Sequence, residues 1–303
     1  MNPLRKMLLI ALSVLLTINI IIINISFMLK FKAFNPDLYI SLLNKYSVYS
    51  DTKNFLQNKL VRAVKDVNLP ENTADNVITT DWVKKQYENI IISFSGVYTG
   101  DNYDIPNIDT TEPKQNFANN LSKVLPKAAI DQDSIRAQEI DNLYNLDSVF
   151  KDFSNISFSV KLKKTITFFY SYFYIFIISF AVLLILCWIT SLNKGTVFKP
   201  FIAGGMICLI PALICTCIGS NAYIIVKHFN IPFASFLSQT QSGALFMGNI
   251  LKIFGIYVSI LSAAFTVLGS VLYTIFSKAY EAKKPDLFRI PLYFQIKNNK
   301  KTL

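Results

Sequence analysis

Four long apolar segments, with one long polar segment between the first two, constrain this chain more than any other feature of its sequence. A helix needs about 20 mainly apolar residues to cross the hydrocarbon core of a bilayer. Residues 7–29, 166–189, 201–226 and 250–276 each reach that length. Charged residues make up only 16% of the chain, against about a quarter in soluble domains. The sequence therefore predicts an all-α integral membrane protein with four transmembrane helices.

The distribution of charge predicts the topology. The net charge is +11, but residues 30–165 contain 17 basic and 17 acidic side chains and are neutral. Nine of the eleven excess positive charges lie in residues 1–6, 190–200 and 277–303, which flank alternate ends of the apolar segments, and Lys227 and Lys252 supply the other two. Basic residues concentrate on the cytoplasmic side of membrane proteins. We therefore expect both termini and residues 190–200 to be cytoplasmic, residues 30–165 and 227–249 to lie outside, and no nucleic-acid partner.

The predicted outer domain, residues 30–165, has helical rather than strand periodicity. Apolar residues at helical spacing predict helices over residues 51–67, from Thr79 to a stop at Gly100, from Thr111 onward, and over residues 131–150. Residues 35–49 are expected to extend the first transmembrane helix outward as a stalk. Together these segments predict an outward-facing α-helical bundle inserted between the first and second transmembrane helices.

The cysteines bear on the cellular location. All four lie inside predicted transmembrane helices, and residues 30–165 contain none. An extracellular domain of this size without disulfides is more typical of a Gram-positive bacterial surface than of an animal ectodomain. We expect a multi-pass protein of the bacterial plasma membrane. Aromatic residues that gather at the outer end of the second segment suit a membrane interface: Phe168, Phe169, Tyr170, Tyr172 and Tyr174.

Small residues recur at three- and four-residue spacing along the third and fourth apolar segments. Such stripes let two helix backbones approach closely in a membrane. The short connection between the segments makes them antiparallel neighbours, so we expect the stripes to form one helix-packing face. Its members are Gly205, Cys208, Ala212, Cys215 and Gly219 on the third segment, and Gly255, Ser259, Ser262, Thr266 and Gly269 on the fourth.

Candidate catalytic and metal-binding residues are few. Lys252, near the outer end of the fourth apolar segment, is the only charged residue in the four, which argues against ion-coupled transport. His228 is the only histidine. The acidic cluster at residues 101–112 lacks the alternating oxygen ligands and glycine of an EF-hand loop, so turn and cap chemistry explains it more simply. We therefore expect a non-enzymatic protein without a cofactor or metal ion.

Several short motifs resemble a family of uncharacterised bacterial four-span membrane proteins. They are the stretch Asn76-Val-Ile-Thr-Thr-Asp-Trp-Val-Lys-Lys-Gln, the turn Tyr98-Thr-Gly, the segment Ile105-Pro-Asn-Ile-Asp, and Leu125-Pro. The sequence departs from the family pattern at Thr99, where a Tyr-Leu pair would precede the glycine. The resemblance implies four spans with a helical extracytoplasmic loop and implies no activity. Claudin-like proteins and cell-division permeases share only the topology.

These observations favour an outward binding or sensing domain carried by a membrane scaffold, with membrane lipid and a protein on the outer face as partners. The alternative is an accessory or permease subunit of a transport complex. The candidate interaction surface is the region where an aromatic helix meets the acidic loop. Its residues are Trp82, Tyr87, Tyr98, Asp101, Asp104, Asp109 and Glu112.

Overall fold

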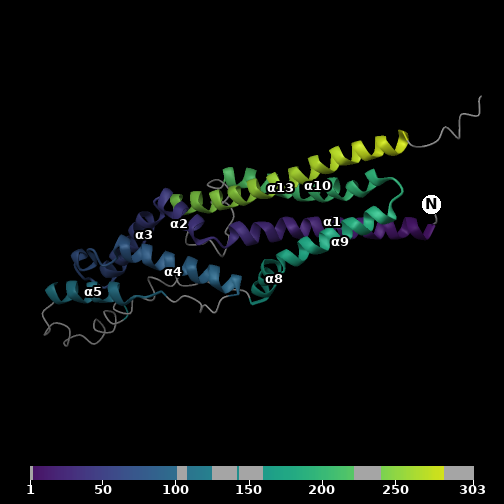
Figure 1. Ribbon diagram of the computed structural model, residues 1–303. Coiled ribbons are helices and arrows are strands. Elements are labelled where there is room, and N and C mark those ends of the chain that lie inside the picture. The colour runs from purple at the N-terminus through teal and green to yellow at the C-terminus, as the bar shows by residue number, and fades with distance from the viewer. Residues whose placement is uncertain (1–2, 101–107, 125–141, 143–159, 222–239, 283–303) are drawn as a thin grey trace, which may run out of the picture. The chain divides into compact units, whose positions relative to one another are not determined.

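The computed structural model describes residues 3–100, 108–124, 142, 160–221 and 240–282 (Figure 1). Over these ranges all regular secondary structure is helical, which confirms the all-α prediction. Four of the described helical segments are long and apolar enough to cross a membrane: Pro3–Ala33, Phe173–Thr190, Lys194–Ser220 and Gln241–Ala282. The prediction of a four-helix integral membrane protein is therefore supported by helix length as well as by hydropathy.

The chain divides into two compact units. Unit 1 comprises Met1–Asn24, Tyr174–Ile210 and Ser259–Leu303, and unit 2 comprises Ile25–Phe173 and Pro211–Val258. Each unit combines segments that are distant in sequence. Three helices, α1 (Pro3–Met28), α10 (Lys199–Ser220) and α13 (Gln241–Ala282), contribute residues to both units.

Unit 1 is built around the first part of α1. Leu16 and Ile20 of this helix are fully buried and belong to one apolar cluster with Cys187 of α9 (Phe173–Thr190) and Phe201 of α10. The outer faces of the same helices are apolar and exposed, as is typical of surfaces in contact with lipid. Examples are Ile10, Val14 and Ile18 on α1, Ile178 and Ile185 on α9, and Ile260 and Val267 on α13.

Unit 2 contains the whole of the polar segment, residues 30–165. After the π-helical turn Leu29–Ala33 come α2 (Pro36–Lys45), α3 (Val48–Asp66), the 3-10 turn Glu71–Ala74, α4 (Thr80–Thr99), α5 (Thr111–Val124) and α8 (Val160–Ser171). Helices α2 to α5 share one core, which also receives two residues from the start of α13. Its fully buried members include Leu43, Val48, Leu56, Leu60, Val64, Ile78, Val83 and Phe117, and α13 adds Phe246 and Ile250.

The predicted periodicity of residues 51–67 is confirmed by α3, whose Leu56, Leu60 and Val64 are fully buried. The predicted start near Thr79 is also confirmed, because the Thr79 hydroxyl accepts a hydrogen bond from the Trp82 N–H. Gly100 ends α4 with a φ of +98°, a conformation that glycine adopts without steric cost. Helix α5 begins at Thr111, as predicted, whereas residues 131–150 lie outside the described residues except for Asn142.

The expected stalk over residues 35–49 is wrong. Asn35 leaves the helical conformation and its side chain accepts a hydrogen bond from the Asp37 N–H, which starts a separate helix with Pro36 in the first turn. Ser47, with a φ of +55°, then separates α2 from α3. Leu42 and Leu43 consequently join the core of unit 2 instead of continuing α1.

Two other helices differ in length from the apolar segments that predicted them. The segment 166–189 is divided between α8 and α9, which meet at Tyr172. Helix α13 has 42 residues and begins nine residues before the apolar segment 250–276. At 1.5 Å per residue it is roughly 63 Å long, about twice the thickness of the hydrocarbon core.

Candidate functional site

The three aromatic residues of the expected interaction surface lie inside unit 2. Trp82, Tyr87 and Tyr98 are only 2%, 6% and 3% exposed, so the prediction that they form a surface is wrong. The Trp82 indole N–H donates to the backbone oxygen of Asp109 at 2.7 Å. These side chains are large and amphipathic, and burial with the polar atom satisfied is their commonest role in a small helical core.

Tyr87 and Tyr98 are each buried by a neighbouring aromatic ring. The Tyr87 ring packs against Tyr49 with centroids 5.8 Å apart, and its hydroxyl is 3.1 Å from the Thr52 hydroxyl. The Tyr98 ring stacks on Phe34 with centroids 5.5 Å apart. The aromatic positions of α4 therefore hold unit 2 together rather than face a partner.

Of the four acidic residues in the expected surface, Asp109 and Glu112 are described and exposed, while Asp101 and Asp104 lie outside the described residues. The Asp109 carboxylate accepts a hydrogen bond from the Thr111 N–H at 3.0 Å, which starts α5. Hydrogen bonding from Thr111 lowers the pKa of Asp109. The Glu112 carboxylate accepts from the Thr79 hydroxyl at 2.9 Å and so joins the first turns of α4 and α5.

This junction between α4 and α5 is the part of the expected site that remains at the surface. The Gln86 side chain accepts from the Asp109 N–H at 3.0 Å, so α4 also fixes the backbone that precedes α5. Asp81 is exposed in the first turn of α4. In the described ranges no group of three or more His, Cys, Asp or Glu side chains is placed to hold a metal ion. The junction thus exposes three carboxylates, those of Asp81, Asp109 and Glu112, which we call the acidic patch.

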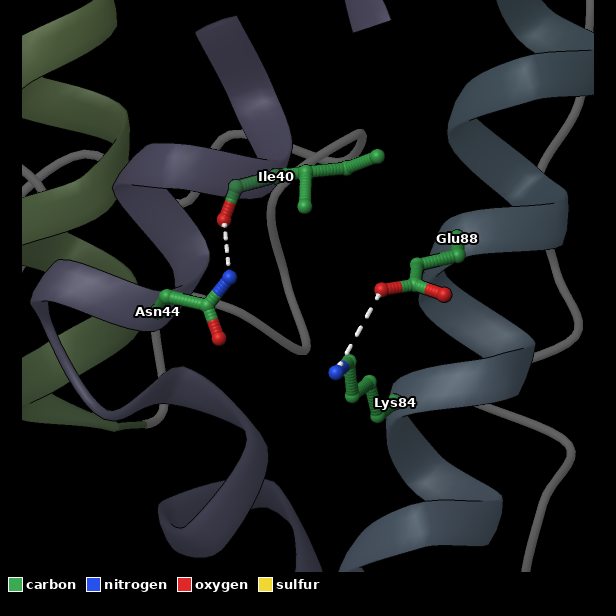
Figure 2. A network of polar contacts seen from close by, with 4 residues as sticks. All are labelled: Ile40, Asn44, Lys84 and Glu88. Atoms are coloured by element: carbon green, nitrogen blue, oxygen red, sulfur yellow. Dashed lines mark hydrogen bonds and ion pairs between the residues drawn. The ribbon is translucent and has the colours of Figure 1, made fainter. Parts of the chain in front are cut away.

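A second polar group lies where α2, α3 and α4 meet. Figure 2 shows the Lys84–Glu88 pair of α4, 4.0 Å apart, and Asn44 of α2, whose amide donates to the Ile40 carbonyl at 3.0 Å. Burial, and secondarily the negative charge of Glu88, raises the pKa of Tyr49 to about 12. The Tyr49 hydroxyl is buried and has no hydrogen-bond partner among the described residues.

The small residues of α10 and α13 within unit 1 meet at very short range. A methyl group added at Gly205 would lie 2.7 Å from the Ser262 carbonyl oxygen and 2.9 Å from the Thr266 nitrogen. One added at Gly269 would lie 2.6 Å from the Phe201 Cβ. Cys208 and Ser262 are buried along the same helices.

The other four members of the small-residue set lie in unit 2, where the helices are also at backbone range. A methyl group at Gly255 would lie 2.7 Å from the Ala212 carbonyl oxygen, and one at Gly219 would lie 2.5 Å from the Gly248 carbonyl oxygen. Cys215 is half-buried. The Ser259 hydroxyl, in unit 1, is buried without a hydrogen-bond partner in the described structure.

Polar side chains of α1 connect it to two neighbouring helices in unit 1. The Asn19 amide donates to the Ser179 hydroxyl of α9, and the Ser262 hydroxyl of α13 donates to the Asn24 side-chain oxygen at 3.1 Å. Gly204, which lies outside the predicted small-residue stripe, brings α10 against Ile20 of α1. The sequence shows this glycine directly beside Gly205. The three- and four-residue steps that defined the stripe on α10 skip it, so the contact with α1 was not predicted.

Arg5 has a structural role that the charge count does not reveal. Its guanidinium donates to the carbonyl oxygens of Thr190 at 2.8 Å and Ile189 at 3.3 Å, which lie at the carboxyl end of α9. A positive charge at this end of a helix is favoured by the helix dipole, and the last carbonyls otherwise have no helical partner. Lys194 acts in the same way on the Ser191 carbonyl at 2.9 Å.

No protein-family model, no curated protein and no solved structure matches this chain. The resemblance to bacterial four-span membrane proteins therefore stays a prediction. Support for a function comes from the geometry of the residues described above.

Proposed function

We propose that this chain is a multi-pass protein of the bacterial plasma membrane that binds or senses a protein partner on the outer face without catalysing a reaction. In this proposal both termini are cytoplasmic, residues 30–165 lie outside, and the membrane helices anchor the outer domain. The acidic patch of Asp81, Asp109 and Glu112 is the contact surface. It replaces the larger aromatic surface that the sequence suggested.

The observation that carries the proposal is the shared core of unit 2. Phe246 and Ile250 are buried among residues of α2, α3 and α4, and both belong to α13, which is also a candidate membrane helix. The polar helices are thus attached to a membrane helix by side-chain packing as well as by chain connectivity. A domain attached in this way suits a role in which binding on the outer face changes the packing of the membrane helices.

The charge distribution supports the proposed orientation. Arg5, Lys194 and Lys199 lie near the ends of α1, α9 and α10 that the positive-inside rule assigns to the cytoplasm. Arg5 and Lys194 also cap the carboxyl end of α9, so their charges serve both orientation and helix termination. The opposite end of α1 leads into residues 30–165, which belong to unit 2 and are the residues predicted to lie outside.

The orientation is tested by single cysteine substitutions labelled in intact cells with a membrane-impermeant maleimide. Lys114→Cys on α5 is expected to react, whereas Lys199→Cys at the start of α10 is expected to react only after the membrane is permeabilised. The reverse pattern would show the opposite topology and would exclude an extracellular binding role for α2 to α5.

The binding role is tested by photo-cross-linking in native membranes with a photoreactive amino acid at Asp81. A partner captured in stoichiometric amounts is expected, and the doubly neutralised variant Asp109→Asn with Glu112→Gln is expected to lose it. Neutralisation of Asp66 and Asp51 on α3 is the matched control. Equal capture by all variants, or capture only from cytoplasmic positions such as Lys199, would contradict the proposal.

The second candidate is an accessory or permease subunit of a transport complex. Its specific support is the set of buried polar side chains on α1, because Asn19 and Asn24 are 6% and 1% exposed within a candidate membrane helix. Buried polar groups in membrane helices often mark a permeation path, although they also bond helices together. Solute flux through liposomes that contain the pure protein would favour this candidate, and an absence of flux would favour helix bonding.

A further inference from the structure

Two segments that lie more than a hundred residues apart in the sequence meet at the last turn of α4, within unit 2. The first is the end of α1, where the π-helical turn Leu29–Ala33 leads into Phe34. The second is α8, which lies beside α4 (Figure 1) and leads into the candidate membrane helix α9. Side chains at the end of α4 hold both segments.

Phe34 is held through its ring and through its backbone. The ring stacks on that of Tyr98 of α4, with centroids 5.5 Å apart. The Phe34 carbonyl oxygen accepts a hydrogen bond from the Ser95 hydroxyl, also of α4, at 2.6 Å. Carbonyl groups at the end of a helix have no partner within that helix, so Ser95 supplies one where α1 stops.

Helix α8 is held by the same turn of α4. The Thr167 hydroxyl donates to the Tyr98 carbonyl oxygen at 3.1 Å. The Tyr170 ring of α8 packs edge-on against the Phe34 ring, with centroids 6.1 Å apart. Phe34 therefore contacts α4 and α8 at the same time, and Tyr98 contacts α1 with its ring and α8 with its carbonyl.

The π-helical turn makes the position of Phe34 depend on these contacts. A π-helical turn holds more residues than an α-helical turn, because its hydrogen bonds join residues five apart instead of four. A change of Leu29–Ala33 to the α-helical pattern would turn Phe34 by about 100° relative to the rest of α1 and remove it from both rings. The packing of Phe34 against α4 and α8 therefore favours the π-helical turn.

Helix α4 also carries part of the acidic patch. It is one helix of 20 residues, roughly 30 Å long, with Asp81 in its first turn and Ser95 and Tyr98 near its end. A rigid helix is one of the elements through which coupling can pass between distant sites. A displacement of the first turn of α4 would therefore reach the contacts with α1 and α8.

We propose that the end of α4 is a coupling joint, through which the end of α1 and α8 form and lose their contacts together. The coupling joint consists of Phe34, Ser95, Tyr98, Thr167 and Tyr170. A partner bound at the acidic patch would act on α1 and α8 together through α4. This consequence rests on the proposed function, whereas the coupling joint itself does not.

Hydrogen exchange in the purified full-length protein tests the coupling joint from both sides, because amides exchange when the structure around them opens locally. Ser95→Ala removes the hydrogen bond to the end of α1, and Thr167→Val removes the hydrogen bond to α4 with little change of shape. Each variant is expected to speed exchange in both Leu29–Ala33 and α8 by about fivefold, the factor that corresponds to one lost hydrogen bond. Ser93→Ala, the same change two residues away on α4, is the matched control and should leave both segments unchanged.

Three outcomes would overturn the proposal. Faster exchange on the altered side alone, in Leu29–Ala33 for Ser95→Ala or in α8 for Thr167→Val, would show that α1 and α8 open independently. An equal increase in α3, which shares the core of unit 2 but contributes no residue to the coupling joint, would mean a general loss of stability. Exchange at the wild-type rate in both variants would mean that these hydrogen bonds hold neither segment. Photo-cross-linking at Asp81 tests the acidic patch separately.

Discussion

At Gly255 two helix backbones are in direct contact, so even one added methyl group must push them apart. Its Cβ would lie 2.7 Å from both the Ala212 carbonyl oxygen and the Thr216 nitrogen. We expect Gly255→Ala to lower the free energy of unfolding by about 1 to 3 kcal/mol, because backbone atoms have no alternative rotamer to adopt. Thermal unfolding in detergent measures this change. The control, Ile256→Ala, removes an exposed apolar side chain and should change stability by less than about 0.5 kcal/mol.

Tyr49 makes the stability of unit 2 sensitive to high pH. Burial raises its pKa from 10.0 to about 12, so the folded state favours the neutral phenol. This contribution is complete below the unfolded pKa and is lost as the pH rises through the folded one. We expect Tyr49→Phe to weaken the alkaline destabilisation between about pH 10 and pH 12 and to leave neutral stability equal or higher, since the hydroxyl has no described partner.

Tyr87→Phe is the companion measurement, because it removes a hydroxyl that does have a partner, Thr52. It should cost about 1 kcal/mol at neutral pH. Burial raises the pKa of Tyr87 too, so both variants should weaken the alkaline destabilisation, and stability at neutral pH separates them. An unchanged alkaline transition in Tyr49→Phe would mean that another buried group controls it.

At the scale of the element, the first turn of α4 depends on one threonine with two contacts. The Thr79 hydroxyl accepts from the Trp82 N–H and donates to Glu112 of α5. Thr79→Ala should therefore lower stability by about 1 kcal/mol or more and increase hydrogen exchange in the first turns of both helices. Thr80→Ala, one residue later and exposed, is the control. Faster exchange in α4 alone would show that the link to α5 is weak.

Helix existence was predictable from sequence where spacing and caps agreed. The apolar positions of α3, the threonine cap of α4 and the start of α5 at Thr111 all follow from local chemistry. The structure of residues 35–49 was not predictable. An apolar segment that continues a membrane helix and one that turns back to pack in a core have the same composition. Only the Asn35 cap and Pro36 distinguish them, and both are weak signals.

The candidate site was predictable in part for a related reason. Periodicity identifies the apolar face of α4 but does not say what covers it, so Trp82, Tyr87 and Tyr98 were assigned to the surface although they are buried. Charge is more informative, because burying a carboxylate that has no metal ion or basic side chain nearby costs too much free energy. Asp109 and Glu112 accordingly lie at the surface. The ring contact of Phe34 with Tyr170 joins segments more than a hundred residues apart and has no local signature.

At the scale of the whole molecule, the polar helices are not expected to be an independently stable domain. Their core includes Phe246 and Ile250, which lie far along the chain on α13. A fragment of residues 35–124 lacks both side chains and exposes the apolar surface they cover. We expect it to be largely unfolded or aggregated by circular dichroism and size-exclusion chromatography. Phe246→Ala in the full-length protein should destabilise the same helices by about 3 to 5 kcal/mol, and a well-folded fragment would contradict this expectation.

Because α13 is one uninterrupted helix, its contacts within unit 2 have a fixed rotational relation to one another. Ile250 lies in the core of unit 2, and Gly255, five residues later, lies against the backbone of α10. One alanine inserted between these two residues would turn their faces by about 100° with respect to each other, so both sets of contacts could not form together. Seven inserted residues would nearly restore the phase. Insertions into this helix are therefore compatible with both sets of contacts only when they add whole seven-residue repeats.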